Sequence, residues 1–95
     1  MIETFTFRLT AGADEEAFLA VDKRLQSEFA YQQPGLVRRT TARGADGDWL
    51  VIDLWSSAEH ADACAARWET DALAQEFMGF VDPSTVQVTR YVELD

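Results

Sequence analysis

The sequence is poor in cysteine, histidine and basic residues, and it has no long apolar run. Its single cysteine, Cys64, has no partner for an internal disulfide bond. The first residues, Met1 to Phe5, lack the basic and long apolar regions of a signal peptide, and no apolar stretch approaches the length of a membrane span. The simplest expectation is a cytoplasmic protein.

Acidic residues outnumber basic ones by 17 to 8, which gives a net charge of −9 and a pI of about 4.4. Such a surface repels phosphate backbones and anionic lipid headgroups. We therefore expect neither nucleic acid nor a membrane surface as a partner.

The chain has 95 residues, of which 47% are hydrophobic, so we expect one folded domain over residues 1–95. Alternating and three-to-four-residue spacings of apolar side chains predict the elements. These are a strand over Ile2–Thr10, a helix from an Asp14 cap to about Tyr31, strands on either side of Gly44–Gly47, a helix from a Ser56 cap to about Trp68, a short helix over Thr70–Phe80 and a strand over Thr85–Leu94. The order is typical of an α+β, ferredoxin-like βαββαβ fold with a four-stranded antiparallel sheet.

The central hairpin, Gln33 to Trp55, fixes which side chains share a face of the sheet. A loop of two or four residues would place Arg38 opposite Asp53 and Arg39 opposite Ile52. One face would then carry Leu36, Arg38, Thr40, Trp49, Val51, Asp53 and Trp55, and the other Val37, Arg39, Thr41, Leu50, Ile52 and Leu54. An odd-length loop would exchange this assignment.

Both of these faces contain apolar residues, whereas the helices can cover only one. We therefore expect the face with Trp49 and Trp55 to pair with the same face of a second chain, which would form a homodimeric barrel. On this interpretation, replacing Trp55 with Asp should weaken association.

Three segments resemble the dimeric α+β barrel superfamily and, within it, antibiotic-biosynthesis-monooxygenase-like proteins. They are Phe7-Arg8-Leu9-Thr10, Gln33-Pro34-Gly35-Leu36 and Leu50-Val51-Ile52-Asp53-Leu54-Trp55-Ser56-Ser57, the last being similar to the family's E-x-W-x-S segment with Asp53 in the acidic place. The resemblance covers nearly the whole domain. It implies a dimeric barrel and, in some members, oxygenation of an aromatic compound without a metal or flavin cofactor.

The haem-degrading branch of the superfamily uses an Asn, a Trp and a His. In this chain the Asn is replaced by Phe7, and the place of the His falls near Ala74. The place of the Trp falls near Cys64, although Trp68 lies one turn further along. The resemblance therefore argues against haem degradation.

His60 is the only histidine, and it is the candidate catalytic base because its unperturbed pKa lies near neutrality. The alternative is a solvated or packing histidine. His60 and Cys64 share a helix face and could begin a metal site, but no further ligands are evident, so we expect no metal. Cys64 could be a nucleophile if His60 lowered its pKa, or a small core residue among alanines.

Arg39 and Thr41 are polar residues expected on the helix-covered face, where a ligand or an acid such as Asp22 or Glu28 must partner them. Tyr31 and Trp68 could line the same cavity. The candidate substrate-binding residues are Arg39, Thr41, Tyr31, Trp68, Phe7 and Phe77, with the phenylalanines alternatively forming the core.

The sequence thus predicts a small homodimer that binds a small apolar or aromatic compound, with cofactor-independent monooxygenase activity as the associated chemistry. The alternatives are a non-catalytic ligand-binding or accessory domain, and a lactone or ketone isomerase on the same fold.

Overall fold

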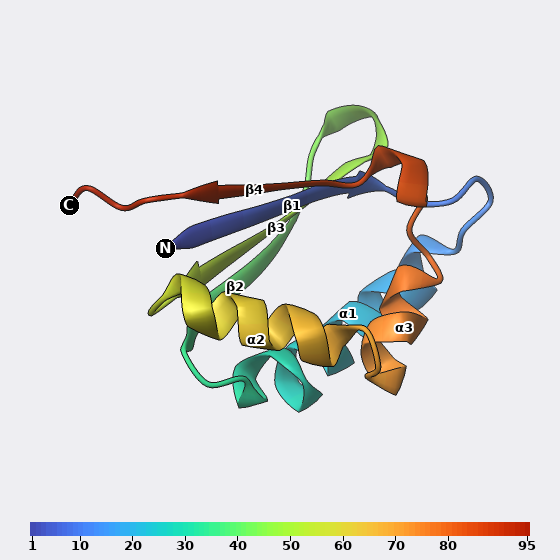
Figure 1. The fold of residues 1–95 in the computed structure, drawn as a ribbon. Coiled ribbons are helices and arrows are strands. Elements are labelled where there is room, and N and C mark those ends of the chain that lie inside the picture. The colour runs from blue at the N-terminus through green and yellow to red at the C-terminus, as the bar shows by residue number, and fades with distance from the viewer.

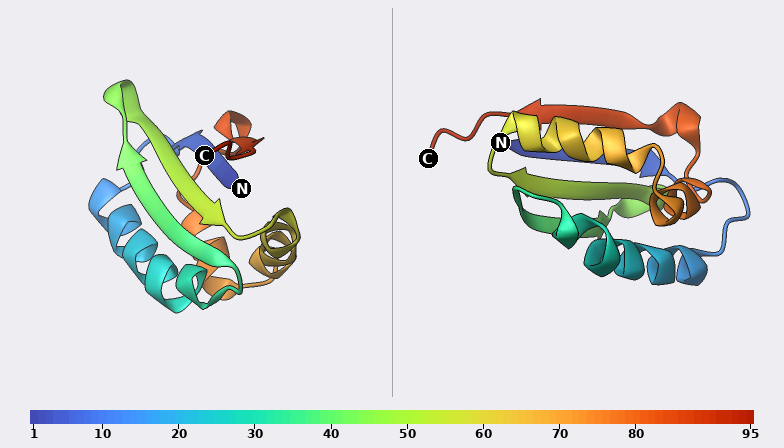
Figure 2. Two further views of the ribbon diagram at one scale, coloured as in Figure 1. Left: turned by 90° about the vertical axis from the view of Figure 1, so that its left-hand side faces the viewer. Right: turned by 60° about the horizontal axis from the view of Figure 1, so that its bottom comes forward.

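The computed structural model describes residues 1–95 and contains one four-stranded antiparallel sheet with its helices on one face (Figures 1 and 2). The strands and helices are β1 (Ile2–Arg8), α1 (Glu15–Glu28), β2 (Leu36–Arg43), β3 (Asp48–Trp55), α2 (Ala58–Trp68), α3 (Ala72–Met78) and β4 (Gln87–Tyr91), with 3₁₀ turns η1 (Ala30–Gln32), η2 (Ala45–Gly47) and η3 (Pro83–Thr85). The strand order β2-β3-β1-β4 confirms the predicted ferredoxin-like fold. None of the helices combines the length and apolarity needed to cross a bilayer.

Side chains cap the helices where their first N–H groups lack partners. Asp14 caps α1 by accepting from the Ala17 N–H at 3.2 Å, as predicted, and Asp71 caps α3 by accepting from the Ala74 N–H at 2.9 Å. The predicted cap of α2 was wrong by one residue, because Ser57 rather than Ser56 caps it. The Ser56 N–H instead donates to the Gly35 carbonyl oxygen, which keeps Ser56 attached to the start of β2.

The register predicted for the central hairpin was wrong by one residue. The loop has three residues, Ala45 to Gly47, and the Gly44 N–H donates to the Asp48 carbonyl oxygen at 2.7 Å. Asp46 and Gly47 adopt positive φ angles of 59° and 83°, the left-handed conformation that such a loop needs. Arg39 consequently lies opposite Asp53, and Thr40 lies opposite Ile52.

The corrected register moves the aromatic residues of β3 into the core of the subunit. Trp49 and Trp55 are 4% and 3% exposed, and Val51 is buried beside them on the helix-covered face. Trp49 and Val51 belong to one buried cluster with Phe7 of β1, Phe18, Leu25 and Phe29 around α1, and Phe77 of α3. The prediction that Trp49 and Trp55 face a second chain is therefore wrong, and Trp55→Asp would disrupt the core rather than an interface.

The opposite face of the sheet has no helix over it (Figure 2, left). It carries Arg38, Leu50, Ile52 and Leu54 from the hairpin, and Ile2, Thr4, Thr89 and Tyr91 from β1 and β4. Val37 is the extra residue at a bulge between Leu36 and Arg38 and is 58% exposed, and Ile52 is 37% exposed. An apolar sheet face without a helix therefore exists and includes Arg38 and Thr40 as predicted, but its apolar residues are not those predicted.

Gly35 joins η1 to β2 in a conformation that favours glycine, with φ of +83°, and it packs against the ring of His60 at the start of α2. A Cβ atom at this position would overlap the ring and lie 2.6 Å from the His60 Cβ. Gly12 has a similar φ of +79° but open space where its Cβ would be.

We expect Gly35→Ala to lower the free energy of unfolding more than Gly12→Ala does. Both variants incur the backbone strain of a positive φ, on the order of 1 kcal/mol, whereas only Gly35→Ala adds an overlap costing about 1–3 kcal/mol. Urea unfolding of the two variants measures the difference. Equal losses would show that the α2 terminus moves to accommodate the new methyl group.

Candidate functional site

A cavity of about 580 Å³ lies between α2 and the helix-covered face of the sheet. Of the 18 residues that line it, 13 are hydrophobic, and they come from all four strands, α2, α3 and the segment after α1. Its volume falls within the range of small-molecule sites, and an apolar lining with a few polar groups is typical of them. The exposed lining residues Ala65, Glu69, Val88 and Arg90 place its opening between α2 and β4.

Four charged residues form a row across the sheet beneath this cavity. In the strand register, Arg39 lies opposite Asp53, Asp53 lies opposite Glu3, and Glu3 lies opposite Arg90, so all four side chains are on the same face. All four line the cavity. Along the row the charges are positive, negative, negative and positive. The other contacts of each side chain determine which charged groups remain free to bind a ligand.

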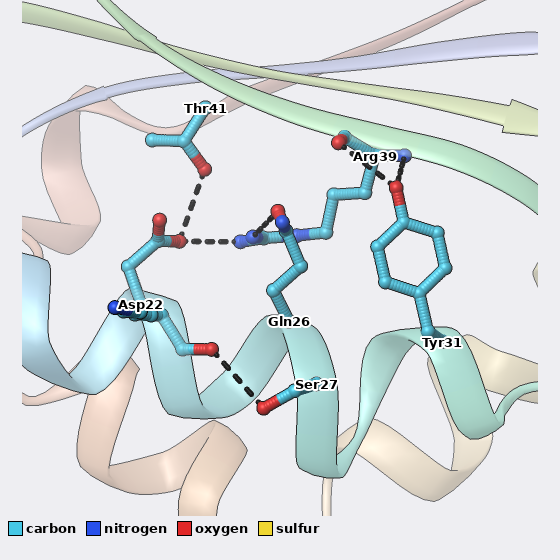
Figure 3. Close-up of polar contacts among 7 residues, drawn as sticks. Asp22, Gln26, Ser27, Tyr31, Arg39 and Thr41 are labelled. Atoms are coloured by element: carbon cyan, nitrogen blue, oxygen red, sulfur yellow. Dashed lines mark hydrogen bonds and ion pairs between the residues drawn. The ribbon is translucent and has the colours of Figure 1, made fainter.

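At one end of the row, α1 neutralises the Arg39 guanidinium (Figure 3). Its Nη2 donates to the Asp22 carboxylate at 2.7 Å and its Nη1 donates to the Gln26 amide oxygen at 3.2 Å, and the side chain is only 4% exposed. The Thr41 hydroxyl donates to the same Asp22 oxygen at 3.0 Å. Arg39 is thus paired with a helix acid, Asp22, which was the alternative to a ligand. Its side chain nevertheless borders the cavity.

At the other end, Arg90 is shared between two acids. Its Nε donates to Glu3 at 2.8 Å and its Nη2 contacts the Asp62 carboxylate at 2.8 Å. Because Asp62 belongs to α2, this side chain connects β4 to the helix across the opening of the cavity. Hydrogen bonds to both acids raise the pKa of Arg90, so it stays charged.

Between these two pairs, the Asp53 carboxyl group is left without a full set of partners. Its Oδ1 atom is buried and accepts no hydrogen bond from the protein. Burial raises the pKa of Asp53 from 3.8 to about 6; the charge of Arg39 opposes this rise, whereas Glu3 and Asp22 add to it. A carboxyl group with this pKa is poised to exchange a proton near neutral pH.

Trp55 and Cys64 border the same cavity from β3 and α2. The Trp55 Nε1 atom is buried and has no acceptor among the protein's groups. Burial, followed by the charge of Asp53, raises the pKa of the Cys64 thiol from 9.0 to about 11. Cys64 therefore remains a protonated thiol at neutral pH, which fits the small-core-residue interpretation and not the nucleophile.

Of the predicted substrate-binding residues, Arg39, Trp68 and Phe77 line the cavity, and Trp68 packs edge-on against Phe29 and Phe77 with centroids 5.7 Å apart. Thr41 and Phe7 do not line it, since Thr41 binds Asp22 and Phe7 is in the core.

Tyr31 also lies outside the cavity, at the edge of β2 (Figure 3). Its phenol accepts from the Arg39 backbone N–H at 2.8 Å and donates to the Arg39 carbonyl oxygen at 3.2 Å.

His60 lies in the first turn of α2, away from the cavity lining. Its Nδ1 atom is 3.0 Å from the Ser56 hydroxyl and 2.8 Å from the Ser57 hydroxyl, and its ring packs on Gly35. These contacts correspond to the packing alternative, and a catalytic role for His60 stays a prediction. The structure groups no three His, Cys, Asp or Glu side chains in a way that could hold a metal ion.

Sequence reasoning missed Asp53 and Trp55 as cavity residues because the one-residue register error placed them on the open face. The signal that could have found them is Asp46-Gly47, a pair that tolerates left-handed conformation and so favours a turn centred there. The opposite charges of Arg39 and Asp53 also favour their pairing across the hairpin.

The raised pKa of Asp53 predicts a pH-dependent difference between the protein and its Asp53→Asn variant. The folded state holds this proton until about pH 6, whereas the unfolded chain loses it near 3.8, so the wild type loses stability as pH rises through this window. We compare the free energies of unfolding of Asp53→Asn and the wild type at each pH. The difference should favour the variant by on the order of 2 kcal/mol more above pH 6 than at pH 3.5. Urea unfolding at both pH values measures this; a pH-independent difference would contradict it.

The sequence matches no protein-family model and no curated protein sequence. The fold matches several solved structures. SnoaB, a cofactor-independent oxygenase from Streptomyces nogalater, is similar with a TM-score of 0.73 and 23% identity over 99% of this chain and 94% of SnoaB. At3g17210 from Arabidopsis thaliana has a TM-score of 0.79 and 13% identity over 99% and 95% of the two chains. An antibiotic biosynthesis monooxygenase has a TM-score of 0.70 and 16% identity over 98% of this chain and all of the other. At these identities the likeness establishes the fold, and the chain therefore has the α+β ferredoxin-like fold of the antibiotic-biosynthesis-monooxygenase-like proteins that its sequence resembles.

Proposed function

We propose that this protein binds a small, apolar aromatic compound in the cavity between α2 and the sheet and oxygenates it without a metal or flavin. The observation that carries the proposal is the Asp53 carboxyl group, which has an unpartnered oxygen and a pKa of about 6 inside a mostly apolar cavity. The fold shared with SnoaB, itself described as a cofactor-independent oxygenase, supports this choice of chemistry.

In the proposed reaction, the Asp53 carboxylate removes a proton from a carbon activated by an aromatic ring. The resulting carbanion gives one electron to O₂, and the two radicals combine to form a C–O bond. The peroxide anion takes the proton back from Asp53 and then loses water as the O–O bond breaks. In total, a CH₂ group and O₂ become a carbonyl group and H₂O, and the substrate supplies all the electrons.

Asp53 suits this task better than an ordinary carboxylate would. A pKa near 6 makes it a stronger base while leaving it mostly ionised at neutral pH. The apolar walls exclude water, which would otherwise solvate both the carboxylate and the carbanion. Trp68 and Phe77 supply aromatic surface on which a planar ring can stack.

We expect Asp53→Asn to lower oxygen uptake with anthrone, a tricyclic ketone with an activated CH₂ group, by about 100-fold or more, because the general base is lost. Asp48→Asn is the matched control: Asp48 is on the same strand, exposed, and paired with Arg8 outside the cavity. An oxygen electrode measures the rate, and mass spectrometry after reaction with ¹⁸O₂ identifies the product.

Each alternative gives a different result in the same assay. Anthrone binding without oxygen uptake would indicate a non-catalytic ligand-binding domain. Exchange of substrate C–H for deuterium without oxygen uptake would indicate an isomerase. A loss in His60→Gln as large as that in Asp53→Asn would assign the base to His60 instead.

We also propose that the open face of the sheet pairs two chains into a homodimeric barrel. Ile2, Leu50, Ile52 and Leu54 supply a continuous apolar surface on β1 and β3, and a helix covers none of it. Burying such a face against its copy removes apolar area from water on both chains.

If this face is the interface, Ile52→Asp should convert the dimer to a monomer in sedimentation velocity at micromolar concentration, because it buries a charge on each chain. Leu19→Asp is the control, since Leu19 is an exposed apolar residue of α1, on the helix side of the sheet. A wild type that sediments as a monomer would overturn the proposal.

A further inference from the structure

Helix α2 covers the cavity but is attached to the rest of the subunit mainly at its two ends. Just before its first turn, the Ser56 N–H donates to the Gly35 carbonyl oxygen at 2.8 Å. In its last turn, Trp68 packs edge-on against two phenylalanine rings of the subunit. Between these points Ala61 is the only residue of the helix that is fully buried. The middle of α2 therefore has little packing to hold it against the sheet.

The middle of α2 also leaves space above the sheet, because its inward side chains are small. Ala61, Cys64 and Ala65 line the cavity from this part of the helix. A single ion pair joins α2 to a strand, in which Arg90 Nη2 of β4 lies 2.8 Å from Asp62 Oδ1. Segments with few buried apolar contacts separate from a fold at the lowest cost. The middle of α2 is thus the part of the cavity wall most easily moved, and one ion pair holds it.

This ion pair crosses the mouth of the cavity. Arg90 is one of the exposed lining residues at the opening between α2 and β4. The Arg90 side chain is 39% exposed and that of Asp62 is 66% exposed, so water and salt reach both. The Arg90 Nε atom also donates to Glu3 at 2.8 Å, which holds the guanidinium in place when it loses Asp62. The pair can therefore break and form again while the strands stay paired.

We propose that Asp62 and Arg90 form a salt-bridge latch across the mouth of the cavity, and that small molecules enter and leave when it breaks and α2 separates from β4. Exposed ion pairs are weak, so the latch opens readily and slows exchange only a few-fold. The latch acts on passage through the mouth and not on the chemistry inside the cavity. It therefore goes beyond the proposed function and can be tested without a substrate.

Cys64 reports the opening of the mouth, because it is the only cysteine of the chain and lines the cavity under α2. The measured quantity is the ratio of two rates of thiol modification. One reagent is N-phenylmaleimide, which is bulky and uncharged, and the other is methyl methanethiosulfonate, which is small and uncharged. Both react with the thiolate, so a change in the pKa of the thiol alters both rates together and cancels in their ratio. The ratio consequently measures passage of a bulky molecule through the mouth.

We expect Asp62→Asn to raise this ratio about two- to fivefold, because the bulky reagent then enters without an ion pair having to break. Arg90→Gln removes the other half of the latch and should raise the ratio in the same way. Asp48→Asn is the matched control, since it breaks an exposed ion pair with Arg8, at 3.0 Å, outside the cavity. An unchanged ratio in Asp62→Asn, or an equal rise in Asp48→Asn, would overturn the proposal.

Salt tests the latch in the wild type without any substitution. Exposed ion pairs are screened as the Debye length falls to about 3 Å at 1 M salt. Raising NaCl to about 1 M should therefore increase the wild-type ratio toward that of Asp62→Asn, whose own ratio should stay nearly constant. A wild-type ratio that does not respond to salt would refute the latch. So would an equal response in both proteins, which would place the salt-sensitive contact elsewhere.

Discussion

The three-residue turn at Ala45 to Gly47 determines on which side of the sheet every side chain of β3 lies. Side chains alternate along a strand, so a single-residue change in pairing would exchange the two faces. With the observed turn, Trp49, Val51 and Trp55 lie under the helices and supply much of the core. Asp53 lies among them for the same reason, and the cavity acquires its carboxyl group as a consequence of how the hairpin closes.

The buried ion pair of Arg39 and Asp22 has a second effect at this site. Arg39 is opposite Asp53 on the neighbouring strand and could have paired with it. Its guanidinium instead donates to α1, which compensates the buried charge there and leaves an Asp53 oxygen free. Burial then outweighs the remaining attraction of Arg39, so the pKa of Asp53 rises. The same contact that attaches α1 to the sheet thus gives the cavity a reactive acid.

Element order, the Asp14 cap of α1 and the ferredoxin-like architecture could be predicted from local patterns, since each depends on a few neighbouring residues. Asp14 and its acidic neighbours mark the start of α1 in this way. Arg39 could be assigned to the helix-covered face, where the helix acids Asp22 and Glu28 were its foreseeable partners, and Asp22 is the one observed. Trp68 could be predicted to line a pocket from its position at a helix end near a turn, and it does line the cavity.

The positions of Asp53 and Trp55 could not be predicted in this way because they depend on whether Asp46 adopts a left-handed conformation. Asp-Gly favours a turn at this place, but by itself it does not fix whether the loop has two, three or four residues, and that number sets the register. Likewise, the spacing of His60 and Cys64 on one helix face says nothing about Gly35, whose close approach to the His60 ring depends on the tertiary fold.

The phenol of Tyr31 has a consequence for how sheets of this protein can join. It occupies both backbone groups that Arg39 turns outward from the edge of β2, so another strand cannot complete a ladder there. The other edge, β4, is exposed along its length. Unlimited growth of a shared sheet needs two free edges on every chain. With one edge blocked, strand addition through β4 stops at two molecules, which protects a small acidic protein from fibrous polymerisation.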